Sequence, residues 1–202
     1  MRIPAEAHTS MPWRIHEIAP DFRIEDVWSF RTPGAGRDDF PVMLAALQAS
    51  NQPGQTTWPT RFLFAVRWKL GAVFGWDRPK AGVRGRVVAT LRERLPDDLR
   101  RCPGRKDPNI PFTPLYQLHD ECAEELANST AHILCHLGWA PVGEDGYELR
   151  MAALVKPGGR LGRIYLAGIK PFRYLIIYPA LTRRWEKAWL NRDLGSNGEI
   201  RP

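Results

Sequence analysis

The stretch Thr130–Lys170, TAHILCHLGWAPVGEDGYELRMAALVKPGGRLGRIYLAGIK, decides the fold. It contains three segments rich in alternating apolar and polar residues, at 130–141, 147–157 and 161–170, which turn-like breaks separate. Such alternation between short turns is typical of antiparallel strands. Two segments of the same texture, 113–119 and 122–127, precede this stretch. Together they predict a five-stranded antiparallel meander.

The two turns of this stretch set the register of the predicted strands. A loop at 144–146 with Gly146 in the left-handed conformation pairs Trp139 with Met151. A two-residue turn at Gly158–Gly159 then pairs Met151 with Leu166. Both turns place apolar side chains on one common face of the sheet. The predicted face consists of Ile133, Cys135, Leu137, Trp139, Met151, Ala153, Val155, Ile164 and Leu166.

A long C-terminal helix is predicted over 171–194, where Pro171 suits the first helical position and Pro179 bends the helix. Its apolar stripe needs a partner, and the apolar sheet face provides one. The stripe consists of Tyr174, Tyr178, Leu181, Trp185 and Trp189. Earlier in the chain, the pattern predicts a strand over 12–18 and helices over 22–30, 40–49 and 61–74.

These elements predict one α+β domain over residues 1–202. Its core is a curved antiparallel sheet of about six strands wrapped around the long C-terminal helix, with two or three short helices after the first strand. Residues 1–11 are expected to form a loose N-terminal arm, and 78–110 a basic, loop-rich insertion.

Several motifs along the chain carry a family resemblance. They are HEIAPDF at 16–22, EDVW at 25–28, GWD at 75–77, NSTAH at 128–132, HLGW at 136–139, KPFR at 170–173 and YPAL at 178–181. With them the chain resembles a bacterial family of unknown function within the SRPBCC (START-like, helix-grip) superfamily. The resemblance implies a helix-grip fold and a hydrophobic cavity for lipids, polyketides, hormones or similar ligands. A minority of the superfamily are cyclases, hydratases or related enzymes, but no catalytic motif carries over to this chain.

The formal charge of +7 comes from one segment. Residues 78–106 hold ten basic and three acidic side chains, whereas the remainder is balanced at 19 of each. This basic segment is either an anion-binding flap, with Arg84, Arg86, Arg92 and Arg94 as candidates, or a solvated loop, and the loop is favoured. Aromatic residues for base stacking are missing from it, so the sequence disfavours nucleic acid as a partner.

One acidic residue is a candidate for catalysis or ligand orientation. A two-residue turn at Asn128–Ser129 pairs Glu124 with Ile133 and directs its carboxyl group into the apolar face, where the pKa would rise. The alternative, which is favoured, is a bulge that leaves Glu124 in water and turns Glu125 inward.

His132 and His136 invite a metal-site interpretation, which their spacing opposes. Four residues apart on a strand, they lie roughly 13 Å from each other, too far to share one ion. They are expected to be structural or surface residues on the face away from the cavity, and no metal or cofactor is predicted.

The remaining features restrict the class of protein. Three widely spaced cysteines without a CxxC motif fit a reducing, cytoplasmic compartment. Neither a secretory signal nor a membrane-spanning apolar run is recognised.

Three functions remain in order of preference. The first is binding of a small hydrophobic or amphipathic ligand between sheet and helix. The second is an enzyme of cyclase, hydratase or aldolase type using Glu124 or a cavity tyrosine. The third is binding of an anion, nucleic acid or membrane surface through Arg78–Lys106. A homodimer stays an open alternative.

Overall fold

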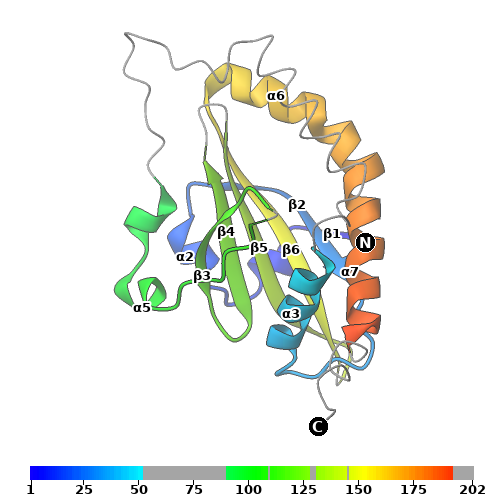
Figure 1. The fold of residues 1–202 in the computed structure, drawn as a ribbon. Coiled ribbons are helices and arrows are strands. Elements are labelled where there is room, and N and C mark those ends of the chain that lie inside the picture. The colour runs from blue at the N-terminus through cyan, green and yellow to red at the C-terminus, as the bar shows by residue number, and fades with distance from the viewer. Residues whose placement is uncertain (52–89, 109, 128–130, 145, 193–202) are drawn as a thin grey trace.

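The structure is a computed structural model that describes residues 1–51, 90–108, 110–127, 131–144 and 146–192. The helix predicted over 61–74 and the first part of the basic segment, 78–89, lie outside these residues. Within them the chain forms an α+β fold built on a six-stranded antiparallel sheet in the order β1-β2-β6-β5-β4-β3 (Figure 1). The strands are β1 Arg2–Ile3, β2 Arg23–Phe30, β3 Thr113–Gln117, β4 Glu121–Ala127, β5 Ala131–Val142 and β6 Gly146–Pro157.

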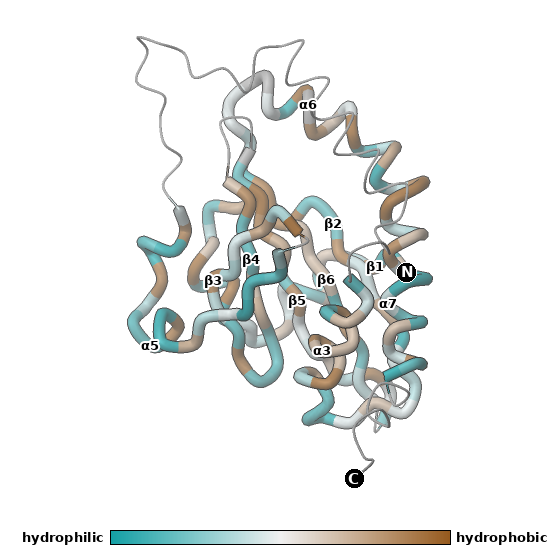
Figure 2. The backbone as a smooth tube through the Cα atoms, in the orientation of Figure 1, coloured by the Kyte–Doolittle hydropathy of each residue, from teal (hydrophilic) through white to brown (hydrophobic). Residues whose placement is uncertain are grey.

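A continuous helical arch follows β6 and runs beside the sheet (Figure 1). It consists of α6 Gly159–Phe172, a π-helical turn η2 Arg173–Ile177 and α7 Tyr178–Leu190. Hydrophobic and hydrophilic residues alternate along it, as in an amphipathic helix (Figure 2). The π-helical turn lies between Pro171 and Pro179, and the arch bends in this region, because prolines lack the N–H that a regular α-helical ladder needs.

The segment 161–170 was predicted as a strand and is helical. Gly159 has φ of 77° and starts α6 rather than a hairpin, so the predicted partnership of Met151 with Leu166 is wrong. In its place β2 pairs with β6, with Trp28 opposite Met151. Short apolar segments fit both the helical and the strand period, and this segment forms an amphipathic helix.

Two further predictions near the N-terminus are wrong. The predicted strand over 12–18 contains α2 Ile15–Ile18, and the predicted helix over 22–30 is strand β2. Residues 26–30 are all buried, since both faces of β2 are covered, and such a strand lacks the alternation that identifies an exposed one. The helix predicted over 40–49 is confirmed as α3 Phe40–Ser50.

The β5–β6 hairpin keeps the predicted face but not the predicted register. Gly143, not Gly146, takes the left-handed conformation with φ of 65°. Trp139 therefore lies opposite Leu149 and Leu137 opposite Met151, a shift of two residues. A shift of two preserves the side on which each side chain lies, so the apolar face is retained.

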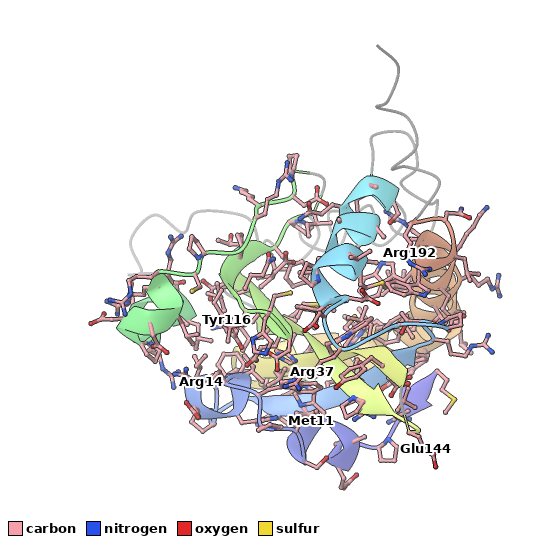
Figure 3. The ribbon with its side chains drawn as sticks, turned by 90° about the horizontal axis from the view of Figure 1, so that it is seen from below. Met11, Arg14, Arg37, Tyr116, Glu144 and Arg192 are labelled. Atoms are coloured by element: carbon pink, nitrogen blue, oxygen red, sulfur yellow. The ribbon has the colours of Figure 1, made fainter. Side chains whose placement is uncertain are left out.

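Both faces of the sheet are covered, although the sequence indicated an apolar face on one side only. Figure 3 shows α3 and α7 on one side and the N-terminal helices on the other. The first side, here the helix face, packs Trp28, Phe30, Trp139, Leu149 and Met151 against residues of α3 and α7. The second side, here the N-terminal face, is covered by α1 Glu6–Thr9, α2, η1 Leu91–Arg94 and α5 Asp97–Arg100.

One close contact fixes the N-terminal segment on its face. The indole ring of Trp13, which is 2% exposed, lies directly over Gly138 of β5. A β-carbon at Gly138 would approach Trp13 Cζ2 to 2.3 Å, so only glycine allows this packing. The residues predicted to form a loose arm are thus docked, with β1 paired to β2 and His8 buried.

Candidate functional site

A row of four side chains crosses the centre of the helix face. Asp26 of β2 lies opposite Ala153 of β6, Ala153 opposite Cys135 of β5, and Cys135 opposite Glu124 of β4. Three strand spacings separate the outer members, so their Cα atoms are about 14 Å apart. This central row therefore has two small side chains in its middle and a carboxyl group at each end.

Larger apolar residues flank the central row on both sides. One neighbouring row consists of Trp28, Met151, Leu137 and Cys122, and the other contains Val155, Ile133 and Leu126. Ile133, Cys135 and Leu137 are only half-buried. The central row and its two flanking apolar rows, whose β5 members are only partly covered, are together called the trough below.

The Asp26 end of the trough is a closed polar cluster. A β-bulge between Ile24 and Asp26 sets the register of this aspartate, and its side chain is fully buried. Tyr178 donates to Asp26 Oδ1 at 2.7 Å, and Arg173 and Tyr174 donate to Oδ2 at 2.8 and 3.2 Å. Arg173 also donates to the Tyr178 hydroxyl oxygen. The π-helical turn supplies Arg173 and Tyr174, and α7 begins with Tyr178.

The charges at this end compensate each other. Arg173 and Asp26 form an ion pair in which both side chains are nearly or wholly buried. Burial raises the pKa of the Tyr178 hydroxyl well above its ordinary range, so this tyrosine stays protonated. The cluster can donate hydrogen bonds and anchor the arch, and it carries little net charge.

The Glu124 end is different, because the described residues offer this carboxyl group no partner. Glu124 lies opposite Cys135 on one side and Pro114 on the other. Within the described part of the chain, its carboxyl group has neither a hydrogen bond nor an ion pair. Burial, assisted by the negative charge of Asp107, raises the pKa of Glu124 to about 7. A carboxyl group with such a pKa can give or take a proton near neutral pH.

The structure gathers most of the predicted cavity residues on one side. The predicted residues of β5 and β6 share the helix face, and Tyr174, Tyr178, Leu181 and Trp185 belong to the same hydrophobic cluster. Leu166 contacts the other end of this face beside Val155, whereas Ile164 is 69% exposed on α6 and lies away from it. That any of these residues contacts a ligand stays a prediction.

The candidate anion-binding arginines are placed only in part. Arg84 and Arg86 lie outside the described residues. Arg94 donates to both carboxylate oxygens of Asp21 at 3.0 and 3.1 Å, and Arg92 is exposed on η1. Arg94 is therefore already partnered, and an anion site in this segment stays a prediction.

Sequence reasoning missed a buried polar chain on the N-terminal face. His8 Nε2 and His136 Nδ1 lie 2.9 Å apart, and His136 Nε2 lies 2.9 Å from Glu121 Oε2. Tyr116 donates its hydroxyl proton to the same oxygen at 2.8 Å, and the backbone N–H of Arg14 donates to Oε1 at 2.7 Å. Figure 3 shows Tyr116 in the interior of the molecule and Arg14 nearer its edge.

These contacts assign the protons of both imidazoles. Although burial opposes it, the hydrogen bond from His136 and those from Arg14 and Tyr116 hold the pKa of Glu121 below its ordinary value. As the carboxylate only accepts, His136 carries its proton on Nε2 and accepts from His8 at Nδ1. Burial lowers the pKa of His136 and lowers that of His8 to about 2. His8 Nδ1 is left as a buried nitrogen without a partner.

The same two strands carry a second buried histidine–glutamate pair, four residues along each strand from the first. His132 Nε2 lies 2.9 Å from Glu125 Oε2, and Thr90 and the backbone N–H of Leu91 also donate to Glu125. His132 and His136 were expected to be either structural or surface residues. Both are buried, so the surface alternative is wrong and the structural one agrees with the contacts. Glu125 lies on the N-terminal face. The alternative register had placed it on the helix face.

A sequence signal for these pairs did exist. Glu121 and Glu125 are four residues apart, as are His132 and His136, on neighbouring strands joined by one turn. The register first expected for that turn sets each glutamate directly opposite a histidine. This complementarity is a property of the two strands together and is absent from either strand alone. Among the described residues, no group of three His, Cys, Asp or Glu side chains could hold a metal ion.

A separate cleft of about 410 Å³ lies at the far end of the β5–β6 hairpin. Its lining includes Tyr147, Val142 and Leu190, with the Arg31–Glu186 ion pair at its side. It does not include any member of the central row. No described helix is long and apolar enough to cross a membrane.

Comparisons with curated proteins and with solved structures find no match for this chain. One family model does match, over residues 18–180, and it is described as a protein of unknown function, DUF2867. The matched range contains the whole central row, Arg173 and Tyr178, whereas His8 precedes it. Because the match covers most of the sequence, the chain belongs to the DUF2867 family.

Proposed function

We propose that the protein binds a small amphipathic ligand in the trough above the central row, as a START-like helix-grip protein would. The observation that carries the proposal is the carboxyl group of Glu124, which lies at one end of the central row among apolar side chains and has no hydrogen-bond or ion-pair partner within the described residues. A half-buried carboxyl group without a partner costs stability, because the group loses part of its hydration without gaining a hydrogen bond. A ligand that supplies a hydrogen-bond partner would remove this cost.

The shape of the face supports the same proposal. Ala153 and Cys135 keep the floor low between larger neighbours, and Ile133 and Leu137 remain half-buried. Binding sites for small molecules combine such apolar walls with a few convergent polar groups. Here Glu124 marks one end of the floor and the Asp26 cluster marks the other.

A second candidate is an enzyme of cyclase, hydratase or aldolase type on the same face. The pKa of Glu124, about 7, favours it, because a general acid–base works best when its pKa is near the working pH. In this case the ligand found on the protein would be converted by wild type, while Glu124→Gln would bind it unchanged. Mass analysis of the ligand after incubation with each protein distinguishes a carrier from an enzyme.

Native mass spectrometry, followed by denaturing extraction, tests the binding function. We expect a small molecule that is released only on unfolding, or saturable binding of the uncharged fluorescent probe Nile red. Ala153→Phe fills the floor of the trough and should abolish both signals. Ala167→Leu, on the exposed side of α6, is the matched control and should preserve them.

Cys135→Leu provides an independent filling variant if Ala153→Phe does not fold, as judged by circular dichroism. Absence of a bound molecule together with absence of saturable probe binding to wild type contradicts the proposal. Probe binding that both filling variants retain contradicts it equally, because the probe would then sit elsewhere.

A further inference from the structure

We infer that the ligand carries a cationic amine, which binds the carboxylate of Glu124, on an apolar body that extends along the central row toward Asp26. This inference rests on the proposed function and names the ligand class that the same trough would take. Three features of the described residues support it: the charge balance at each end, the neighbours of Glu124, and the apolar floor between the ends.

The two carboxyl groups of the row differ in whether the described residues give them a partner of opposite charge. Asp26 has Arg173 as a charge partner and accepts from Tyr178 and Tyr174. It therefore has no requirement for a cation from outside. Glu124 has no such partner in the described part of the chain, so it is the end of the trough where a charge remains to be compensated.

The surroundings of Glu124 favour a cation over an anion. The groups that interact electrostatically with it are Asp107, Cys122 and Cys135. Asp107 is buried, accepts a hydrogen bond from Asn51 at 2.8 Å and interacts electrostatically with the Arg184 guanidinium. Two carboxyl groups therefore face one cation, and the local balance is negative when both are ionised. Burial raises the pKa of both thiols, so they stay neutral. An ammonium group complements this negative setting, whereas a carboxylate or phosphate group would be repelled.

The floor of the row determines the rest of the molecule. Beyond Glu124 come Cys135 and Ala153, which offer no charged group for about 14 Å until the Asp26 cluster. The apolar body of a ligand can cover these small side chains between Leu137 on one side and Ile133 on the other. The class that fits is a linear alkyl or arylalkyl amine.

Three ten-carbon probes with different head groups test the inference: decylamine, decanol and decanoate, each below its micelle concentration. Isothermal titration or tryptophan fluorescence at pH 7.5 measures their affinities. We expect decylamine to bind at least tenfold more tightly than decanoate, with decanol between them. Glu124→Gln should remove the preference for the amine and preserve decanol binding, while Glu6→Gln, at an exposed site on α1, should change nothing.

The pH profile provides a second, independent readout. An ammonium group pairs with the ionised form of Glu124, whose pKa in the free protein is about 7. The affinity for decylamine should therefore rise about tenfold per pH unit below pH 7 and become constant above it. Decanol binding should be flat over the same range, and so should decylamine binding to Glu124→Gln.

The outcomes separate the two proposals. Equal or tighter binding of decanoate, with decanol also bound, overturns the amine inference but sustains the amphipathic trough. An amine affinity that does not depend on pH, or that Glu124→Gln leaves unchanged, likewise overturns the assignment to this carboxylate. Failure of all three probes to bind, with no co-purifying molecule, would instead reject the proposed function itself.

Discussion

Replacing His8 by glutamine should remove one component of the acid sensitivity of folding. His8 is 0% exposed and lies 2.9 Å from His136. A glutamine amide can still donate a hydrogen bond to His136 Nδ1, but it does not titrate. The variant therefore tests the titration of His8 with little change in packing.

The magnitude follows from the two pKa values of His8. Burial lowers the pKa from 6.5 to about 2, so below pH 6.5 the unfolded chain binds a proton that the folded chain refuses. The stabilisation is complete above pH 6.5 and decreases as the pH falls, by about 1.4 kcal/mol per pH unit. At pH 5.0 the wild type has lost about 2 kcal/mol from this group alone.

Glu124 titrates in the same range with the opposite sign. Its pKa is raised from 4.5 to about 7, so the folded state keeps a proton that the unfolded state releases, and acid stabilises it. The two effects partly cancel in the wild type. The informative quantity is therefore the difference between wild type and His8→Gln, in which the contribution of Glu124 cancels.

Urea unfolding at pH 7.5, 6.5, 5.5 and 5.0 measures this difference. We expect the advantage of wild type over His8→Gln to decrease by about 2 kcal/mol between pH 7.5 and 5.0. His119→Gln, at a side chain that is 83% exposed, is the control and should follow wild type. Parallel curves for wild type and His8→Gln would refute the reasoning, since they would mean that His8 has an ordinary pKa in the folded protein.

Four further substitutions probe the fold and the trough. Gly138→Ala brings a β-carbon into the overlying indole ring and should lower the free energy of unfolding in urea by about 1–3 kcal/mol. Gly168→Ala, which has open space around it on α6, is the control and should raise that free energy by up to about 1 kcal/mol. Asp26→Asn leaves Arg173 buried without its charge partner and should cost about 3 kcal/mol or more, seen as a fall in Tm; an unchanged Tm would contradict the buried pair. The stability of Glu124→Gln relative to wild type should increase by about 2–3 kcal/mol from pH 5 to pH 8 in urea unfolding, because an ionised carboxyl group no longer has to be held in a half-buried position. No change with pH would show that Glu124 has an ordinary pKa in the folded protein.

The sequence predicted the helix face well because a register error of two residues leaves every side chain on the same side of the sheet. The registers expected from the turns at 128–129 and 144–146 each differ by two residues from those observed, and neither shift moves Cys135 or Glu124 to the other side. The hairpin expected at 158–159 is absent, because α6 begins there. The helix stripe from Tyr174 to Trp189 followed from its spacing alone. Local patterns of this kind depend on neighbours along the chain or across one turn.

Features that depend on distant segments were not predictable in the same way. Strand β2 pairs with β6, more than a hundred residues away, and covering both of its faces removed the alternation that would identify it. The burial of His136 depends on His8, 128 residues away, and no local pattern shows that the N-terminal segment docks there. The polar cluster at Asp26 needs a bulge and a π-helical turn, for which the sequence offers only the two prolines as indications.

The π-helical turn at Arg173–Ile177 also constrains how the chain can evolve in length. Each residue of an α-helix adds about 100° of rotation, so losing one residue from this turn would rotate all of α7 by that angle. Trp185 and Trp189 would then leave the sheet, although every side chain were still present. Substitutions along the arch change single contacts, whereas a one-residue deletion between Pro171 and Pro179 would change which side of the helix meets the core. The number of residues in this interval is therefore under a constraint of its own, separate from their identity.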